Sequence, residues 1–200
     1  MPLLYDPFLL LAELRGLRRL RGEVIGQARG RVLELGAGTG LNMRHYSGVD
    51  RLVLTDPEPG MAKRLEQRVK AGPVAGEVVT APAEQLPFDD CSFDAVVATM
   101  VFCTVSDPQT ALRETRRVLA PGGRLLFIEH VRADDGSRLE RWQDRCCRAW
   151  RAFAYGCRCN QDTLELIGAA GLRTTKVDTA RWRGMPPIVH PVVYGSAETI

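Results

Sequence analysis

The sequence predicts an α/β fold in which a mostly parallel sheet carries helices on both faces. Along the 200 residues, short apolar runs alternate with longer stretches of helical spacing, the pattern expected when strands and helices follow one another. Several apolar runs are continuous, as in parallel strands that are buried on both faces. One of them, residues 32–35, ends in three closely spaced glycines, Gly36, Gly38 and Gly40. Such glycines indicate a loop where a ligand approaches the main chain.

Composition narrows the class of protein. A chain of 200 residues with 45% hydrophobic residues suits one domain with a single core, so we expect one domain over residues 1–200. The net charge of +3 gives no reason to expect a nucleic-acid partner. No apolar run approaches the ~18 residues of a membrane span, and the N-terminus is no convincing secretion signal. Six cysteines then indicate reduced thiols rather than disulfides, and we expect a soluble cytoplasmic protein.

The N-terminal segment has helical spacing over residues 9–27, and we expect residues 1–30 to form a helical lid. One predicted face is apolar and carries Leu10, Leu14, Leu17 and Val24. The arginines lie largely elsewhere. Before this helix, Tyr5 and Asp6 either close over a bound ligand or form an ordinary capping turn.

The remaining predicted elements alternate along the chain. Strands are expected at residues 32–35, 51–55, 77–80, 93–99 and 124–128, with two closing strands at 172–179 and 188–194. Helices are expected at residues 41–46, 57–70, 108–118, 138–153 and 161–170. Asp107 suits the N-cap of the helix at 108–118 and Pro108 its first position. The helix at 41–46 would direct its free N–H groups at a ligand in the glycine loop.

The helix around residues 138–153 has two contrasting faces. Arginines recur on one of them, at positions 138, 141, 145 and 148. The other predicted face is apolar: Trp142, Cys146, Ala149, Trp150 and Phe153. We expect residues 132–170 to form a helical cap over the substrate. The apolar face then either lines an acceptor pocket or packs on the core beneath a solvated basic face.

Asp56 ends an apolar run twenty residues beyond Gly36. A carboxylate at that place can accept two hydrogen bonds from a ribose diol, although it also suits a helix N-cap. The glycine spacing differs from the dinucleotide pattern, because Leu41 stands where a third spaced glycine is required. No Gly-Lys-Ser or Gly-Lys-Thr follows, so a P-loop is excluded. These features indicate a nucleoside-binding domain.

The segment Glu34-x-Gly36-x-Gly38-x-Gly40 resembles motif I of the class I S-adenosylmethionine-dependent methyltransferases. Residues 83–94 resemble the loop on the adenine side and the fourth strand of that superfamily, and residues 114–123 its turn before the fifth strand. The resemblance implies a Rossmann-like, seven-stranded sheet whose last strand is antiparallel, with S-adenosyl-L-methionine as cofactor. It implies these cofactor-binding residues: Tyr5, Glu34, Gly36, Ala37, Gly38, Asp56, Pro57, Ala83, Glu84 and Thr99. Many relatives have an Asp where Pro82 stands, so contact with the adenine amino group is left to Glu84 or the main chain.

Residues 101–105, 128–131 and 156–160 are similar to the alkyl-thiol S-methyltransferases. This resemblance implies methyl transfer to a small, fairly apolar acceptor, with a thiol favoured. Quinone carbon and phospholipid amine are alternatives, and a phospholipid would bring a peripheral membrane contact through the arginines at residues 15–21. Alternatives of other classes are a partner protein that binds the cofactor without catalysis and, more distantly, a dehydrogenase.

His130 is the candidate base, because it ends the fifth predicted strand, where open α/β sheets hold their ligands. It either accepts a proton from the acceptor or orients it, unless it only hydrogen-bonds a neighbouring loop. Glu129 is an alternative base, or a buried acid paired with an arginine. Cys103 either touches the substrate or is a small hydrophobic residue in a packed segment. The remaining cysteines lack C-x-x-C spacing, so we expect no metal site.

Overall fold

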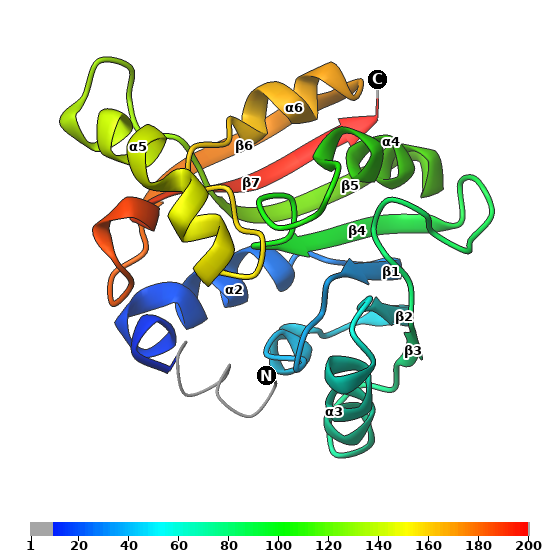
Figure 1. The fold of residues 1–200 in the computed structure, drawn as a ribbon. Coiled ribbons are helices and arrows are strands. Elements are labelled where there is room, and N and C mark those ends of the chain that lie inside the picture. Colours follow the sequence, from blue (N-terminus) through cyan, green and yellow to red (C-terminus); the bar gives the residue numbers. More distant parts are fainter. Residues whose placement is uncertain (1–9, 200) are drawn as a thin grey trace.

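A computed structural model describes residues 10–199 and shows one seven-stranded sheet with helices on both faces (Figure 1). The strand order is β3-β2-β1-β4-β5-β7-β6. Strand β7 runs antiparallel to both β5 and β6, and the other neighbouring pairs are parallel. The predicted architecture, with its last strand antiparallel, is confirmed.

The strands have the bounds β1 Gly30–Leu35, β2 Val49–Thr55, β3 Glu77–Val79, β4 Phe93–Thr99, β5 Leu119–His130, β6 Leu172–Arg181 and β7 Pro191–Thr199. The helices are α2 Arg18–Ile25, α3 Pro59–Lys70, α4 Pro108–Val118, α5 Arg138–Phe153 and α6 Thr163–Ala169. Helix α4 begins as predicted, because the Asp107 carboxylate accepts the N–H groups of Gln109 and Thr110, both at 3.1 Å.

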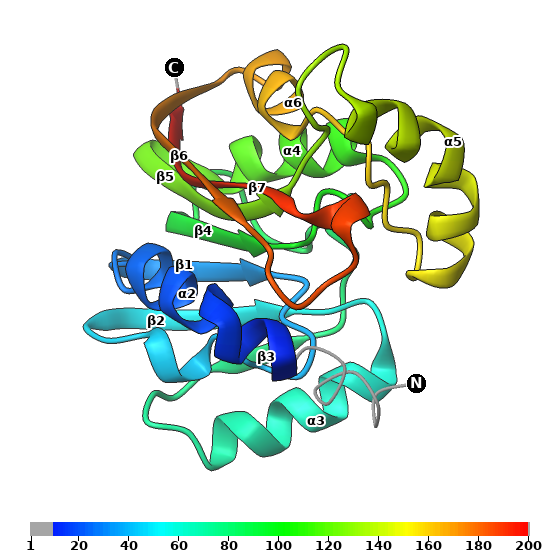
Figure 2. The same ribbon diagram turned by 90° about the vertical axis from the view of Figure 1, so that its left-hand side faces the viewer.

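The sheet has a hydrophobic core on each of its two faces. Successive residues of each central strand belong to opposite cores, because side chains alternate across a sheet. Val32 and Val97 belong to the core that contains Ile25 of α2 and Leu65 of α3. On the opposite face, Leu33, Val96 and Phe127 pack with Leu112 of α4 and Ile167 of α6, and Figure 2 shows these two layers from the side. Burial on both faces explains why these strands are apolar at nearly every position.

The N-terminal helical segment is broken at Gly16, whose φ is +128°. A wider π-helical turn at Glu13–Leu17 precedes α2 and changes which side chains point inward. Leu17 and Val24 are buried, whereas Leu10 and Leu14 are 56% and 71% exposed. The prediction of one shared apolar face was therefore wrong for the two N-terminal leucines.

The predicted helix at residues 41–46 was also wrong. Only a short 3₁₀ turn, Met43–His45, forms after the glycine loop. The N–H groups of Met43 and His45 donate to the carbonyls of Gly40 and Asn42, at 3.2 and 2.8 Å. These donors serve the turn and are not directed at a ligand.

The last strand begins and ends later in the sequence than predicted. Strand β7 begins at Pro191 rather than at Ile188, which lies in the 3₁₀ turn Pro187–Val189. Prolines at 186, 187 and 191 remove main-chain donors and favour this irregular connection. Similarly, α6 begins at Thr163 and not at Gln161, because the side chain of Asp162 caps it by accepting the N–H of Glu165 at 3.0 Å.

The site lies at the edge of the sheet where the parallel strands end. Strands β1, β2, β4 and β5 all present their carboxyl ends there, and so does β6 through its antiparallel pairing with β7. Helix α5 is fastened to the same edge by Gln143, which donates to the carbonyls of Val131 at 3.2 Å and Ile188 at 3.0 Å. Within residues 10–199, none of the helices is both long and apolar enough to cross a membrane.

Candidate functional site

The glycine loop after β1, here called the cradle, is half-buried at Gly36 and Gly38 and buried at Ala37. Gly36 and Gly38 have φ values of +55° and +58°, which side chains rarely adopt. A Cβ atom on Gly36 would also lie 3.0 Å from a methyl group of Val101. The N–H of Ala37 donates to the carbonyl of Thr55 at 2.8 Å, which fixes the loop against β2. The positive φ angles of both glycines and the Val101 contact at Gly36 explain why the loop carries glycine at these positions.

Gly40 has a different role from the first two glycines. Its φ is +82°, and a Cβ atom there would lie 2.8 Å from Cδ1 of Leu65 in α3. The third glycine therefore allows close packing between the loop and a helix.

Asp56 lies beside this cradle and is almost completely buried. Its Oδ2 accepts the N–H of Gly38 and its Oδ1 the N–H of Glu58, both at 2.9 Å. Burial raises the pKa of the Asp56 carboxyl, while the two N–H donors oppose that shift. Helix α3 begins only at Pro59, after the N-cap Glu58, so Asp56 does not cap it. Each carboxylate oxygen keeps a second lone pair for a ligand hydroxyl.

Glu34 is buried beneath the glycine loop and holds it in place. Its Oε1 accepts from the Asn42 amide at 2.9 Å, and its Oε2 from the Tyr46 hydroxyl at 2.6 Å. Burial raises the pKa of Glu34 to about 7, although both hydrogen bonds favour the charged form. Asn42 also donates to the Thr99 hydroxyl at 3.1 Å and accepts from Arg21 at 2.7 Å. The network thereby connects α2, the loop and the end of β4.

The sequence did not identify Arg21, Asn42 and Tyr46 as residues of the site. Arg21 is only 6% exposed and forms a 2.8 Å ion pair with Glu13. No periodic pattern or motif marks these residues. The one available signal was an isolated Asn close behind the glycine loop.

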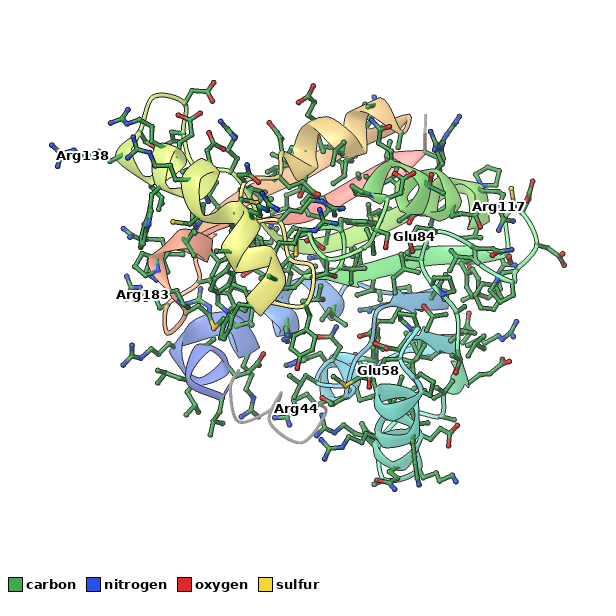
Figure 3. All side chains as sticks on the ribbon, in the orientation of Figure 1. Arg44, Glu58, Glu84, Arg117, Arg138 and Arg183 are labelled. Carbon is green, nitrogen blue, oxygen red and sulfur yellow. The ribbon has the colours of Figure 1, made fainter. Side chains whose placement is uncertain are left out.

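The segment expected on the adenine side is fixed by Glu84. Its Oε1 accepts the N–H groups of Ser106 at 2.7 Å and Asp107 at 3.2 Å, so it ties the segment to the start of α4. Figure 3 shows Glu84 beside β4 and α4, and Glu58 beside α3. Ala83 is buried and Pro57 is exposed. Tyr5 lies outside the described residues.

His130 ends β5 and is fully buried. Its Nε2 lies 2.8 Å from Sγ of Cys157, and its ring stacks on Trp182 with centroids 6.2 Å apart and an interplanar angle of 19°. Nδ1 is buried and has no hydrogen-bond partner within the described chain. The structure thus shows the loop contact that the sequence left open, and it also leaves one ring nitrogen unsatisfied.

Within residues 10–199 no arginine pairs with Glu129, so the alternative of a buried acid paired with an arginine was wrong. Its carboxylate accepts the main-chain N–H groups of Val101, Phe102 and Cys103, at 2.7, 3.1 and 3.4 Å. Burial raises the pKa of Glu129 to about 7 against the effect of these donors. Glu129 therefore holds the loop after β4 in place. Three N–H groups, rather than a cation, stabilise its carboxylate.

The structure gathers Cys103, His130 and Cys157 from three distant segments, with Sγ, ring nitrogen and Sγ all within 4.8 Å of one another. The Sγ atom of Cys157 also accepts from the indole N–H of Trp150 at 3.1 Å. Hydrogen bonding from Cys103, and then from His130 and Trp150, lowers the pKa of Cys157 against its burial. Two thiols and an imidazole are residue types that can bind a metal ion. Cys103 is therefore more than the inert packing residue that the sequence allowed.

Helix α5 presents only part of the predicted apolar face to the core, where Cys146 and Trp150 pack. Trp142 and Phe153 are 45% and 70% exposed, whereas Gln143 is fully buried. Trp150 is half-buried and faces Cys157. The apolar side chains of α5 are thus divided between solvent and the core.

Comparisons with known proteins agree with this geometry. Residues 33–127 match a family described as a methyltransferase domain. Thiol S-methyltransferase TMT1B of Homo sapiens is 33% identical over 195 residues, covering 94% of this chain and 76% of that protein. The ubiquinone/menaquinone biosynthesis C-methyltransferase UbiE of Enterobacter sp. (strain 638) is 38% identical over 119 residues, covering 56% of this chain and 47% of that protein.

A solved structure with the same fold is a SAM-dependent methyltransferase of Thermotoga maritima, described as a possible histamine N-methyltransferase. It is 23% identical, with a TM-score of 0.73 over 98% of this chain and 95% of that one. Another, geranyl diphosphate C-methyltransferase of Streptomyces coelicolor, is 16% identical, with a TM-score of 0.75 over 94% of this chain and 82% of that one. Because the human relative matches over most of both chains and the sheet has the predicted topology, the chain belongs to the class I S-adenosylmethionine-dependent methyltransferases.

Proposed function

We propose that the protein methylates the sulfur of a small, fairly apolar thiol, with S-adenosylmethionine as the methyl donor. Two human relatives named thiol S-methyltransferases support the thiol: TMT1B, at 33% identity, and TMT1A, at 31% identity over 169 residues. The bound cofactor supplies a methyl group on a positively charged sulfur. The protein has to bind it, align an acceptor with it and exclude water.

Cofactor binding is assigned to the cradle and its neighbours. The main chain of Gly36, Ala37 and Gly38 would hold the amino-acid part, and Asp56 the ribose hydroxyls. Glu34 would contribute indirectly, because it holds the glycine loop in place, and so would Thr99, which shares the Asn42 amide with it. Pro57, Ala83 and Glu84 would border the adenine, and Tyr5 would close over the cofactor. The free lone pairs of Asp56, which lies hydrogen-bonded beside the glycine loop, support this assignment.

The unpartnered Nδ1 of His130 is the observation that carries the thiol proposal. An alkyl thiol is mostly protonated near neutral pH, so a base that removes its proton speeds attack on the methyl group. Nδ1 lies at the carboxyl edge of the sheet, on the strand next to β4, which ends at Thr99. We therefore assign His130 as the group that accepts the acceptor's proton.

The acceptor would be covered from two sides. We propose that residues 1–30 form a lid and that residues 132–170 form a cap. Within the cap, α6 packs against α4 and β6, so the acceptor is covered by α5 and the loop that follows it. Figure 3 shows Arg138 at the far end of α5 from the sheet.

We place the protein in the cytoplasm, because its six cysteines are all free thiols. A peripheral membrane contact would involve the exposed Leu10 and Leu14, with Arg18 and Arg19 beside them. It belongs chiefly to the phospholipid alternative, and binding to anionic vesicles that salt abolishes would support it.

The deciding experiment is incubation with isotopically labelled S-adenosylmethionine and a panel of thiols, quinones, phenols and amines, with mass spectrometry of the products. A labelled thioether as the fastest product is expected. A labelled quinone carbon would favour the second candidate, which the UbiE relative supports. Tight cofactor binding without turnover on any acceptor would instead indicate a binding protein.

A further inference from the structure

We propose that Cys157 is a positioning residue for His130: its sulfur accepts the Nε2 proton and thereby directs a bare Nδ1 at the acceptor thiol. The inference rests on the proposed role of His130 and extends it to a second residue. The 2.8 Å separation between Nε2 and Sγ is its first support. Both side chains are at least nine-tenths buried, at 0% and 6% exposure, so water does not compete for this contact.

The surroundings of Cys157 make its sulfur an acceptor. The indole of Trp150 can only donate, and its Nε1 lies 3.1 Å from Sγ. The Cys103 thiol lies in the same group and is a further donor. The lowered pKa of Cys157 is consistent with a sulfur that is surrounded by donors. With Nε2–H donating to this sulfur, the neutral imidazole has its lone pair on Nδ1.

The fold holds the pair from several directions. Gly156 adopts a φ of +89°, and a Cβ atom there would lie 3.0 Å from the Thr104 carbonyl, so the chain turns tightly against the loop after β4. The N–H of Arg158 donates to the Cys103 carbonyl at 2.7 Å. On the other side, Trp182 stacks on the imidazole and limits its rotation. These contacts fix the ring plane before any acceptor arrives.

Proton and electron pairs balance in the proposed step. The thiol proton moves to Nδ1, and its bonding pair stays on the acceptor sulfur. That sulfur forms the new S–CH₃ bond, while the bond between the methyl carbon and the sulfonium sulfur breaks and leaves a neutral thioether. The imidazolium is stabilised by the Cys157 sulfur at Nε2, as a carboxylate stabilises the histidine of a serine protease.

Hydrogen bonding describes the cluster better than metal binding does. Nitrogen and sulfur ligands on a tetrahedral zinc ion lie about 3.5 Å apart, given Zn–N and Zn–S distances of ~2.1 and ~2.3 Å. The observed 2.8 Å is shorter and suits an N–H···S contact. Among the described residues, two titratable groups besides Cys103 interact with the pair: Cys159 with Cys157, and Glu129 with His130. The Glu129 carboxylate is engaged by the N–H groups of residues 101–103.

The test compares Cys157→Ala with Cys159→Ala, a buried thiol two residues away whose Sγ lies 3.7 Å from the Gln143 carbonyl instead. Turnover is measured with an alkyl thiol, which is at least as weak an acid as cysteine with its pKa of ~8.5 and is mostly protonated at the assay pH, and with an aromatic thiol that is already ionised at that pH. Cys157→Ala should lower kcat for the alkyl thiol by about tenfold or more. It should have much less effect on the ionised acceptor and on the cofactor Kd. Equal losses with both acceptors, or equal losses in the Cys159 variant, would show a structural role only.

Two further measurements keep the inference separate from the proposed function. Removal of the base in His130→Ala should slow the alkyl thiol about 100-fold or more; if it does not, the proposed base fails whatever Cys157 does. If His130→Ala slows that reaction and Cys157→Ala does not, only the positioning role fails. In the wild-type protein, ¹⁵N spectra of the three histidines at pH 8 should show His130 protonated on Nε2 alone. A proton on Nδ1, or one zinc ion per chain by elemental analysis, would overturn the inference.

Discussion

Asp56 and Gly38 are joined by a 2.9 Å hydrogen bond from the glycine N–H to the carboxylate. The bond connects the end of β2 to the loop that follows β1. One side chain therefore both shapes the cradle and offers its remaining lone pairs to a ligand. The position of the ribose and the shape of the glycine loop should consequently change together when this carboxylate is altered.

Replacing Asp56 by Ala should weaken cofactor binding by about 1–3 kcal/mol, the cost of losing hydrogen bonds to a charged group. Isothermal titration with S-adenosylhomocysteine measures the loss directly. Asp50→Ala is a matched control, because Asp50 is an exposed carboxylate near the start of β2. Unchanged affinity in the Asp56 variant would refute the ribose assignment.

Gly36→Ala should reduce cofactor affinity far more than Gly48→Ala. Both glycines have positive φ, +55° and +66°, so each variant carries a similar backbone strain of about 1–2 kcal/mol. Only Gly36 is crowded, since its new Cβ atom would lie 3.0 Å from Val101, whereas nothing lies within 4 Å at Gly48. Thermal melting should show the larger loss of stability in the Gly36 variant, because of the Val101 contact, and titration at a temperature where both variants are folded compares their affinities. Equal affinities would mean that no ligand approaches the main chain at Gly36.

Asn42→Ala should destabilise the fold by about 2–3 kcal/mol. The substitution removes partners of Glu34, Thr99 and Arg21 at once and leaves buried polar groups unsatisfied. Urea denaturation measures the change. Gln27→Ala is the control, because that exposed amide donates only to the Glu23 carbonyl and should cost less than about 0.5 kcal/mol. Similar effects of the two substitutions would show that the network contributes little to stability.

The sheet and the cradle were predictable because their signals are local. Continuous apolar runs identify the buried strands. Gly36 directly follows β1 and Asp56 directly follows β2. Because each lies next to the end of a strand, the spacing along the sequence is enough to locate both residues. The fold and the positions of the glycine loop and of Asp56 therefore followed from neighbouring residues.

The other residues of the candidate site are brought together by contacts between segments that are distant in the sequence. Arg21 and Asn42 are 21 positions apart, and His130 and Cys157 are 27 apart; no local pattern predicts either pair. Residues 41–46 were assigned to a helix because their composition permits one, whereas the side chain of Asn42 is engaged by Glu34 and Arg21. In the same way, the exposure of Leu14 follows from the backbone at Gly16, which apolar spacing does not reveal.

The free energy of unfolding should decrease as the pH rises, because of Glu34. Its pKa is about 7 in the folded protein against an ordinary 4.5. Below pH 4.5 the carboxyl is protonated in both states. Between pH 4.5 and 7 the unfolded chain loses this proton while the folded chain keeps it, so each rise of one pH unit costs about 1.4 kcal/mol, up to about 3 kcal/mol in total.

Glu34→Gln isolates this effect, because an amide accepts from Asn42 and donates to the Tyr46 oxygen without titrating. Chemical denaturation of both proteins at pH 4.5, 6 and 7.5 gives the difference in unfolding free energy. The wild type should lose stability relative to the variant as the pH rises, and the difference should level off above pH 7. Glu129, whose pKa is raised in the same way, is common to both proteins and cancels in the comparison. A difference that is constant with pH would mean that Glu34 titrates alike in the folded and unfolded states, and that its burial is offset by its hydrogen bonds.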